Sequence, residues 1–82
     1  MNEQLSFEIN ANYDFFARNL GNFLAEHSGQ YALLKNRHVV GFFDEPGSAY
    51  RHGKENFSDG LFSIQEVTEE PVDLGFFSHV SN

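Results

Sequence analysis

The 82-residue sequence contains no cysteine and no tryptophan, and it has only two prolines. Without cysteine, the chain can form no disulfide, no thiolate nucleophile and no thiolate metal site. Basic residues are also scarce, because five Lys and Arg stand against twelve Asp and Glu, which gives a formal charge of −7. Binding to a phosphate backbone or to an anionic membrane requires clustered cations. We therefore expect neither nucleic acid nor a membrane as a partner.

Long apolar runs are missing as well, since none approaches the ~20 residues that a membrane-spanning helix needs. The first residues, Met1–Gln4, carry an acid and lack both the basic start and the apolar stretch of a signal peptide. Together with the lack of cysteine, this predicts a cytoplasmic protein of bacterial type. A chain of this length forms one domain with a modest core, which buries ~60–65% of the surface that the unfolded chain exposes.

Phenylalanine, in contrast, is abundant: the chain has ten, and six of them form the adjacent pairs Phe15-Phe16, Phe42-Phe43 and Phe76-Phe77. The second and third pairs fall in segments that read as strands, where neighbouring side chains point to opposite faces of a sheet. A small sheet with helices on one side can cover only one of these faces. The pairs therefore predict either an unusual internal cover or an apolar surface that is kept for a protein partner.

The first predicted helix is amphipathic, has about four turns, follows a cap at Asn10 or Asn12 and ends at Gly29. Its apolar residues recur at helical spacing: Tyr13, Phe16, Ala17, Leu20, Phe23, Leu24 and His27. Residues 1–10 alternate in hydropathy and are predicted to be an arm, either disordered or added as an edge strand. Residues 11–80 are predicted to form the single domain.

A β-hairpin is predicted next, from strands 30–34 and 39–43 around the polar turn 35–38. Its loop is either the two residues Asn36-Arg37, with strain at Arg37 because both positions favour positive φ, or a longer one. In the register set by the two-residue loop, Leu34 faces Val39, and each following pair is one residue further along both strands. The other pairs of the predicted register are Leu33–Val40, Tyr31–Phe42, Ala32–Gly41 and Gln30–Phe43.

A second helix begins near Asp44–Pro46 and carries Gly53 on its apolar stripe, which predicts a close approach to a neighbouring strand. Segments 61–67 and 72–77 alternate as two further strands. The predicted fold is therefore α+β, a single two-layer domain of order α-β-β-α-β-β, whose antiparallel-rich four-stranded sheet packs on two helices.

The run SGQYALLKNRHVVGFFD (residues 28–44), followed by SAYRHGKENF and LFSIQEV, resembles a family of small bacterial proteins known as a domain of unknown function. Members of that family share the pattern GKYVLI-x-NG-x-VVG-x-FD, then a short helix ending in G-x-x-RF, then a strand like PFLVKQV. The likeness extends over residues 12–78 and rests on hydrophobic patterns, so it implies the fold and no catalytic residue. Arg37 stands where the family usually turns on Gly, and Leu61 where Pro is common.

Catalytic and metal-binding patterns are not evident. The histidines, His27, His38, His52 and His79, are 11, 14 and 27 residues apart, whereas zinc ligands usually come in closely spaced pairs. No serine lies in a Gly-x-Ser-x-Gly turn, and no glycine loop of a nucleotide-binding type is present. We therefore expect no catalytic residue, no metal and no cofactor.

The sequence thus favours a non-enzymatic module for protein–protein contact, either a homodimer or an accessory to a larger partner. The predicted contact surface is the open face of the sheet, with Leu34, Val39, Phe43 and Phe77. Four such side chains would form an apolar patch of a size that usually marks a contact. The alternative is a small apolar ligand held between sheet and helices by Tyr31, Tyr50 and Phe57.

Overall fold

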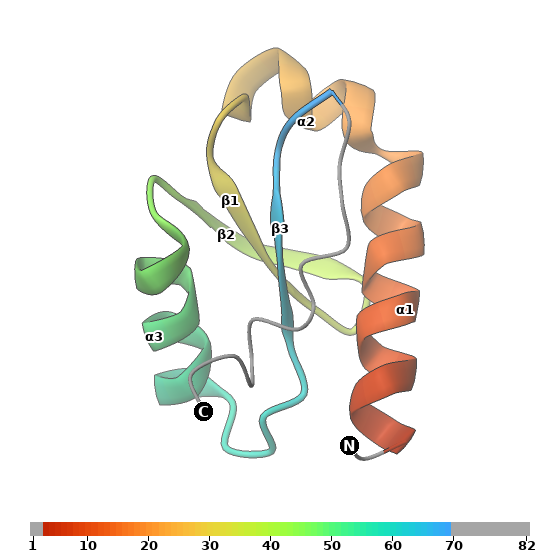
Figure 1. Cartoon of the computed structure of the whole chain (residues 1–82), viewed down its shortest axis with the longest axis vertical. Helices are drawn as coiled ribbons and strands as arrows, with labels where there is room; N and C mark the ends of the chain where they lie inside the picture. The colour runs from red at the N-terminus through yellow and green to blue at the C-terminus, as the bar shows by residue number, and fades with distance from the viewer. Residues whose placement is uncertain (1–2, 70–82) are drawn as a thin grey trace.

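The computed structural model describes residues 3–69, which form three helices and three strands (Figure 1). In chain order they are α1 (Glu3–Arg18), α2 (Leu20–His27), β1 (Tyr31–Lys35), β2 (His38–Phe43), α3 (Pro46–Asn56) and β3 (Ser63–Glu66). The strands make one antiparallel sheet in the order β2-β1-β3. The predicted α+β class is confirmed, but the order α-β-β-α-β-β is wrong. The predicted fourth strand, with Phe76-Phe77, lies outside the described residues.

Helix α1 begins at Glu3, so the prediction of a disordered arm or an edge strand is wrong from that residue onward. The alternation of Leu5, Phe7 and Ile9 was misleading, because Phe7 is 73% exposed. The buried positions instead follow the turns of a helix and continue into the predicted apolar stripe. They are Glu8, Ile9, Asn12 and Phe16.

The predicted four-turn helix is interrupted at Asn19, which separates α1 from α2. The Asn19 side chain donates to the Phe15 carbonyl over 2.8 Å, while its backbone carbonyl accepts from Asn22 over 3.1 Å and starts the next helix. An asparagine can stop one helix and start another because its short amide competes for backbone groups. The end at Gly29 is confirmed: its φ of 86° is the left-handed conformation that glycine adopts without strain.

The hairpin turn is the predicted Asn36-Arg37 pair, and both residues have positive φ, 53° and 61°. Leu34 pairs with Val39 as expected. A β-bulge then leaves Val40 without a partner on β1, so that Gly41 pairs with Leu33.

The predicted pairs beyond the bulge are therefore wrong, because each β2 residue is displaced by one position. Phe42 lies opposite Ala32, and Phe43 lies opposite Tyr31. Since a shift of one residue moves every following side chain to the other face of the sheet, the two phenylalanines exchange faces.

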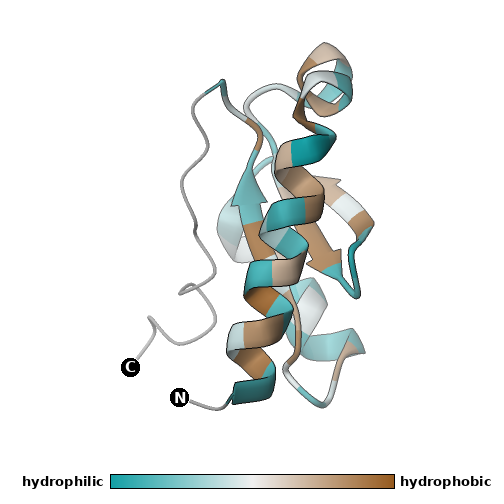
Figure 2. Ribbon diagram, turned by 90° about the vertical axis from the view of Figure 1, so that its right-hand side faces the viewer, coloured by the Kyte–Doolittle hydropathy of each residue, from teal (hydrophilic) through white to brown (hydrophobic). Residues whose placement is uncertain are grey.

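Helices cover both faces of this sheet, which makes three layers instead of the two predicted. On one face the buried cluster is Phe16, Ala32, Leu34 and Val67, next to α1 and α2. On the other it is Leu33, Ala49, Phe62 and Ile64, next to α3. Figure 1 shows α3 and α1 on opposite sides of the strands, and Figure 2 shows α1 in front of them.

Gly53 makes the close approach that its position on α3 predicts. A Cβ at this residue would lie 2.7 Å from the Phe62 ring, which is closer than side chains can pack. Phe62 is 1% exposed, and a buried phenylalanine of this kind contributes about 3–5 kcal/mol relative to alanine.

Candidate protein-contact surface

The four residues of the predicted contact surface do not lie on one open face. Leu34 is fully buried beneath α1 and α2, and Val39 packs beside it. Phe43 lies on the opposite face, where it packs against the cluster next to α3. Phe77 lies outside the described residues. The prediction of a shared surface is wrong for the first three because the bulge at Val40 changes the facing of Phe43 and because both faces carry helices.

The three residues of the alternative ligand site do come together. Tyr31, Tyr50 and Phe57 are half-buried and pack against the cluster on the α3 side. A hollow of about 240 Å³ lies nearby, but Tyr50 is the only one of the three among its lining residues. The described residues that line it are Leu5, Tyr50, Lys54, Asp59, Gly60, Leu61 and Phe62. This volume is below the ~300–1,000 Å³ that is typical of small-molecule sites.

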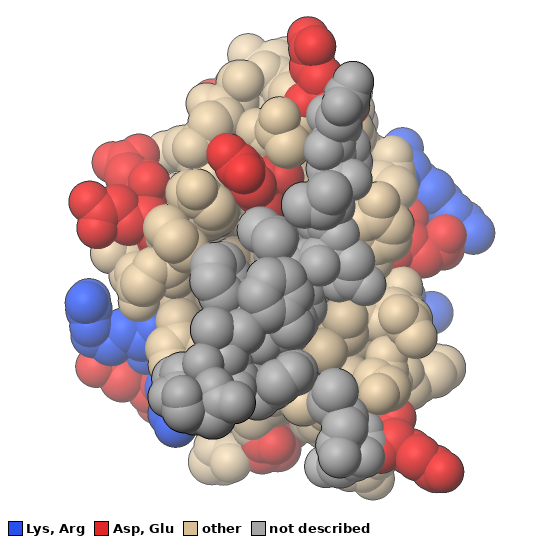
Figure 3. All heavy atoms as spheres, in the orientation of Figure 1, with Lys and Arg blue, Asp and Glu red and all other residues tan. Residues whose placement is uncertain are grey.

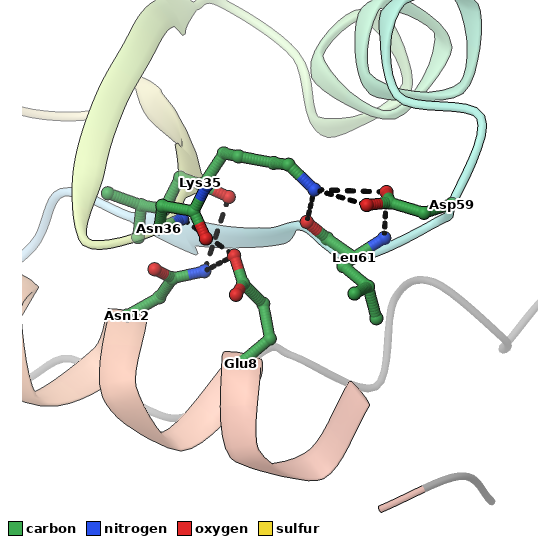
Figure 4. Close-up of polar contacts among 7 residues, drawn as sticks. Glu8, Asn12, Lys35, Asn36, Asp59 and Leu61 are labelled. Atoms are coloured by element: carbon green, nitrogen blue, oxygen red, sulfur yellow. Dashed lines mark hydrogen bonds and ion pairs between the residues drawn. The ribbon is translucent and has the colours of Figure 1, made fainter. Parts of the chain in front are cut away.

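A buried polar cluster joins α1 to the hairpin, and it was not foreseen from the sequence (Figure 4). Asn12 is 0% exposed, and its Nδ2 lies 3.1 Å from Glu8 Oε2, 3.3 Å from the Leu34 carbonyl and 3.1 Å from Ser63 Oγ. Asn12 is thus an interior residue of the helix and not the predicted cap. Two polar residues four positions apart, within an otherwise apolar helix face, were the signal in the sequence.

The same cluster fixes the turn. The Asn36 amide donates to Glu8 Oε2 over 2.7 Å, and the Arg37 amide donates to Asn12 Oδ1 over 2.7 Å. A positive φ costs a non-glycine residue about 1–2 kcal/mol, so the turn needs compensation that Asn-Gly would not require. Hydrogen bonds to a carboxylate and to a buried amide supply it. We assign this cluster a structural role.

Lys35 anchors the loop between α3 and β3. Its Nζ lies 2.9 and 3.0 Å from the two Asp59 carboxylate oxygens and 2.7 Å from the Leu61 carbonyl. It also lies 5.0 Å from the centre of the Phe57 ring. The hydrogen bond that the Leu61 amide donates to Asp59, and then the bond from Lys35, lower the pKa of that carboxyl below 3.8. The Lys35–Asp59 ion pair therefore has a structural role, because it holds the loop between α3 and β3.

The open apolar surface is found at α2 and β2. Helix α2 contains no buried residue, although Leu20, Phe23 and Leu24 face the sheet and pack on its cluster from outside. Val39 and Phe42 of β2 pack on the same cluster. We call these side chains of the two elements the α2–β2 surface. Its residues are Leu20, Phe23 and Leu24 on α2 and Val39 and Phe42 on β2.

Aromatic contacts hold the α2–β2 surface in place. The Phe23 ring lies 5.4 Å from that of Phe16 and 5.6 Å from that of Phe42, the latter edge-on. His27 stacks on Phe42 with the ring centres 3.6 Å apart and the planes 4° apart. Each such aromatic pair contributes about 0.5–1.5 kcal/mol beyond the area that it buries. These contacts hold the partly exposed rings of Phe23 and Phe42 against the buried Phe16.

A chain of side-chain hydrogen bonds borders this surface. His27 Nδ1 lies 2.8 Å from Gln30 Oε1, and Gln30 Nε2 donates to Asp44 Oδ1 over 3.0 Å. These contacts connect the end of α2 to the end of β2, so the two elements of the surface are joined to each other and not only to the core.

The described residues also bear on three other kinds of binding site: an acidic patch, a metal site and a membrane-spanning helix. In Figure 3 the acidic side chains are scattered among uncharged ones instead of forming one patch. Among residues 3–69, no three His, Asp or Glu side chains are grouped so that they could hold a metal ion. Within the same range, no helix is long and apolar enough to cross a membrane.

Comparison with known proteins yields no relative. No family model matches the chain, and no curated protein and no solved structure matches it significantly. The resemblance to a family of small bacterial proteins therefore stays a prediction.

Proposed function

We propose that this protein is a non-enzymatic module for protein–protein contact and that the α2–β2 surface is its binding site. The observation that carries the proposal is that α2 packs three large apolar side chains on the sheet cluster and leaves part of each at the surface. An isolated exposed apolar residue is ordinary, whereas a contiguous group on two adjoining elements usually marks a contact.

The energy available at such a surface supports this function. Complete burial of a Leu or Phe side chain is worth about 1.5–3 kcal/mol, and about a third or less of each side chain here is exposed, so covering the remainder contributes at most about 0.5–1 kcal/mol per residue. Five residues therefore offer at most a few kcal/mol, and the apolar surface of the partner must add to this because association has a cost of at least about 4 kcal/mol. The aromatic contacts of Phe23 and Phe42 reduce the further cost of ordering side chains on binding.

Substitution of Leu24 by lysine provides the test. Leu24 is half-buried, and a lysine stem can cover the same apolar neighbours while it places a charge in the contact. The matched control is Phe7→Lys, which changes an apolar residue that is 73% exposed on α1, outside the surface.

Proteins captured by the wild type from the source cell should be identified, produced in pure form and titrated against all three chains by calorimetry. We expect Leu24→Lys to weaken the direct complex by at least about tenfold, while Phe7→Lys leaves it unchanged. Direct binding that tolerates Leu24→Lys, or the absence of any partner including a second copy, would contradict the proposal.

A further inference from the structure

We propose that the partner at the α2–β2 surface is a second copy of this chain, docked so that the two β2 strands run antiparallel. This inference rests on the proposed function and names its partner. Among the described residues, β2 is an edge strand of the sheet.

Charge along β2 is arranged with opposite signs at its two ends. Arg37 and His38 stand at its start, and Asp44 and Glu45 follow its end. All four are exposed, and the five residues between them, 39–43, carry no charge.

Antiparallel docking matches these ends to each other. Gly41 lies at the midpoint, four residues from both Arg37 and Glu45 and three from both His38 and Asp44. A two-fold axis near Gly41 therefore places the basic end of one copy beside the acidic end of the other, and does so twice. A parallel arrangement would instead place like charges together. The self-complementary pattern selects both the second copy and its orientation.

The contacts within each copy leave these groups available. No described side chain pairs with Arg37 or Glu45, whereas Arg18 and Lys35 are held by acids of their own domain. Asp44 accepts a hydrogen bond from Gln30, which fixes its position at the end of β2.

The bulge determines what kind of contact forms. It places Val40 off the regular ladder, and a bulge on an edge strand prevents an extended main-chain pairing. The interface is therefore made by side chains: the apolar residues of the α2–β2 surface at the centre, and the charged pairs at the rim. Because the two-fold arrangement uses the same surface on both copies, it closes at two and does not continue into a fibre.

A pair of charge reversals tests the arrangement. Arg37→Glu creates acid facing acid in its own homodimer, and Glu45→Arg creates base facing base. Each should raise the dissociation constant by about tenfold, as expected for two reversed rim contacts. Mixed together, the two variants face each other with opposite charges at both contacts and should form a heterodimer about as tight as the wild type.

Sedimentation velocity, run over concentrations up to about 1 mM, measures the homodimers. Native mass spectrometry then identifies the heterodimer, because the two chains differ in mass. The control pair is Arg51→Glu with Glu55→Arg, which makes the same changes in net charge at exposed positions of α3. Neither of these should alter association as strongly, and their mixture should gain nothing. Circular dichroism melting of each variant separates loss of fold from loss of contact.

The possible results are distinct. Heterodimer recovery in the first mixture and not in the control mixture supports the antiparallel dimer. A wild type that stays monomeric at about 1 mM overturns it, and so does a dimer indifferent to Arg37→Glu. If the dimer is absent but a different protein binds in a manner sensitive to Leu24→Lys, this inference fails while the proposed function stands. If both are absent, both fail.

Discussion

Replacement of the buried Asn12 by alanine should be among the most destabilising changes outside the apolar core. The substitution removes a side chain that contacts α1, β1, the hairpin turn and β3 together. It leaves the half-buried Arg37 amide and the buried Ser63 hydroxyl without their partner. The fold of α1 itself should persist, because alanine is a strong helix former.

The magnitude follows from these contacts. Each net hydrogen bond contributes about 0.5–1.5 kcal/mol, and a buried group left unpaired costs about 1–3 kcal/mol. Helix propensity returns less than about 1 kcal/mol, so the expected loss is about 2–4 kcal/mol. A domain of this size has a free energy of unfolding of about 4–12 kcal/mol. The melting temperature should therefore fall by about 10–25 °C.

Urea unfolding followed by circular dichroism measures this loss. The control is Asn10→Ala, an exposed asparagine two residues away on the same helix, which should stay within about 0.5 kcal/mol of the wild type. The reasoning would be refuted if Asn12→Ala lost less than about 1 kcal/mol, or no more than Asn10→Ala.

Three further outcomes are expected. Arg37→Gly should raise the free energy of unfolding by about 0.5–1 kcal/mol in urea titrations, because glycine adopts the φ of 61° without strain; a decrease would contradict this. Gly53→Ala should lower the melting temperature, since its methyl group would lie 2.7 Å from the Phe62 ring and overpacking costs about 1–3 kcal/mol, whereas Gly47→Ala, with open space around it, should be neutral or stabilising. The neighbouring amide and ammonium lower the pKa of Asp59, so its stabilising contribution is complete above the unfolded value near 3.8 and is lost as the pH falls through the folded value. The stability difference between wild type and Asp59→Asn should shrink over that interval, and NMR titration of the carboxyl should give a pKa below 3.8; a value at or above 3.8 would count against it.

Local features of this fold could be predicted from the sequence because short-range physics decides them. The apolar stripe that includes Phe16 and Phe23 indicated a helix, Gly29 indicated its end, and Asn36-Arg37 indicated the turn. Each depends on residues within a few positions of one another.

The contact surface could not be predicted because it depends on one displaced residue. Gly41 has room beside it for the Phe43 ring, which would lie 3.3 Å from a Cβ at that position, and the bulge at Val40 accompanies this packing. A glycine within a strand was the available signal for a bulge. Once the bulge is present, Phe43 leaves the expected face and Phe42 joins the α2–β2 surface.

Contacts between residues far apart in the sequence could not be predicted for a different reason. Nothing near Glu8 or Asn12 indicates that a turn 25 to 28 residues later will need their oxygen atoms. Such a requirement appears only when α1 is placed against the sheet, and this placement depends on the whole fold.

The buried contact between Asn12 and Ser63 also determines when α1 can be fully packed during synthesis of the chain. The two residues are 51 positions apart, so at ~5–20 residues per second Asn12 is synthesised ~3–10 s before the strand that it contacts. Before β3 is made, only the β1–β2 hairpin can cover the side of α1 that carries Ile9 and Phe16. The contacts of α1 are therefore completed only when β3 joins the sheet, and until then part of this apolar face is left uncovered for seconds.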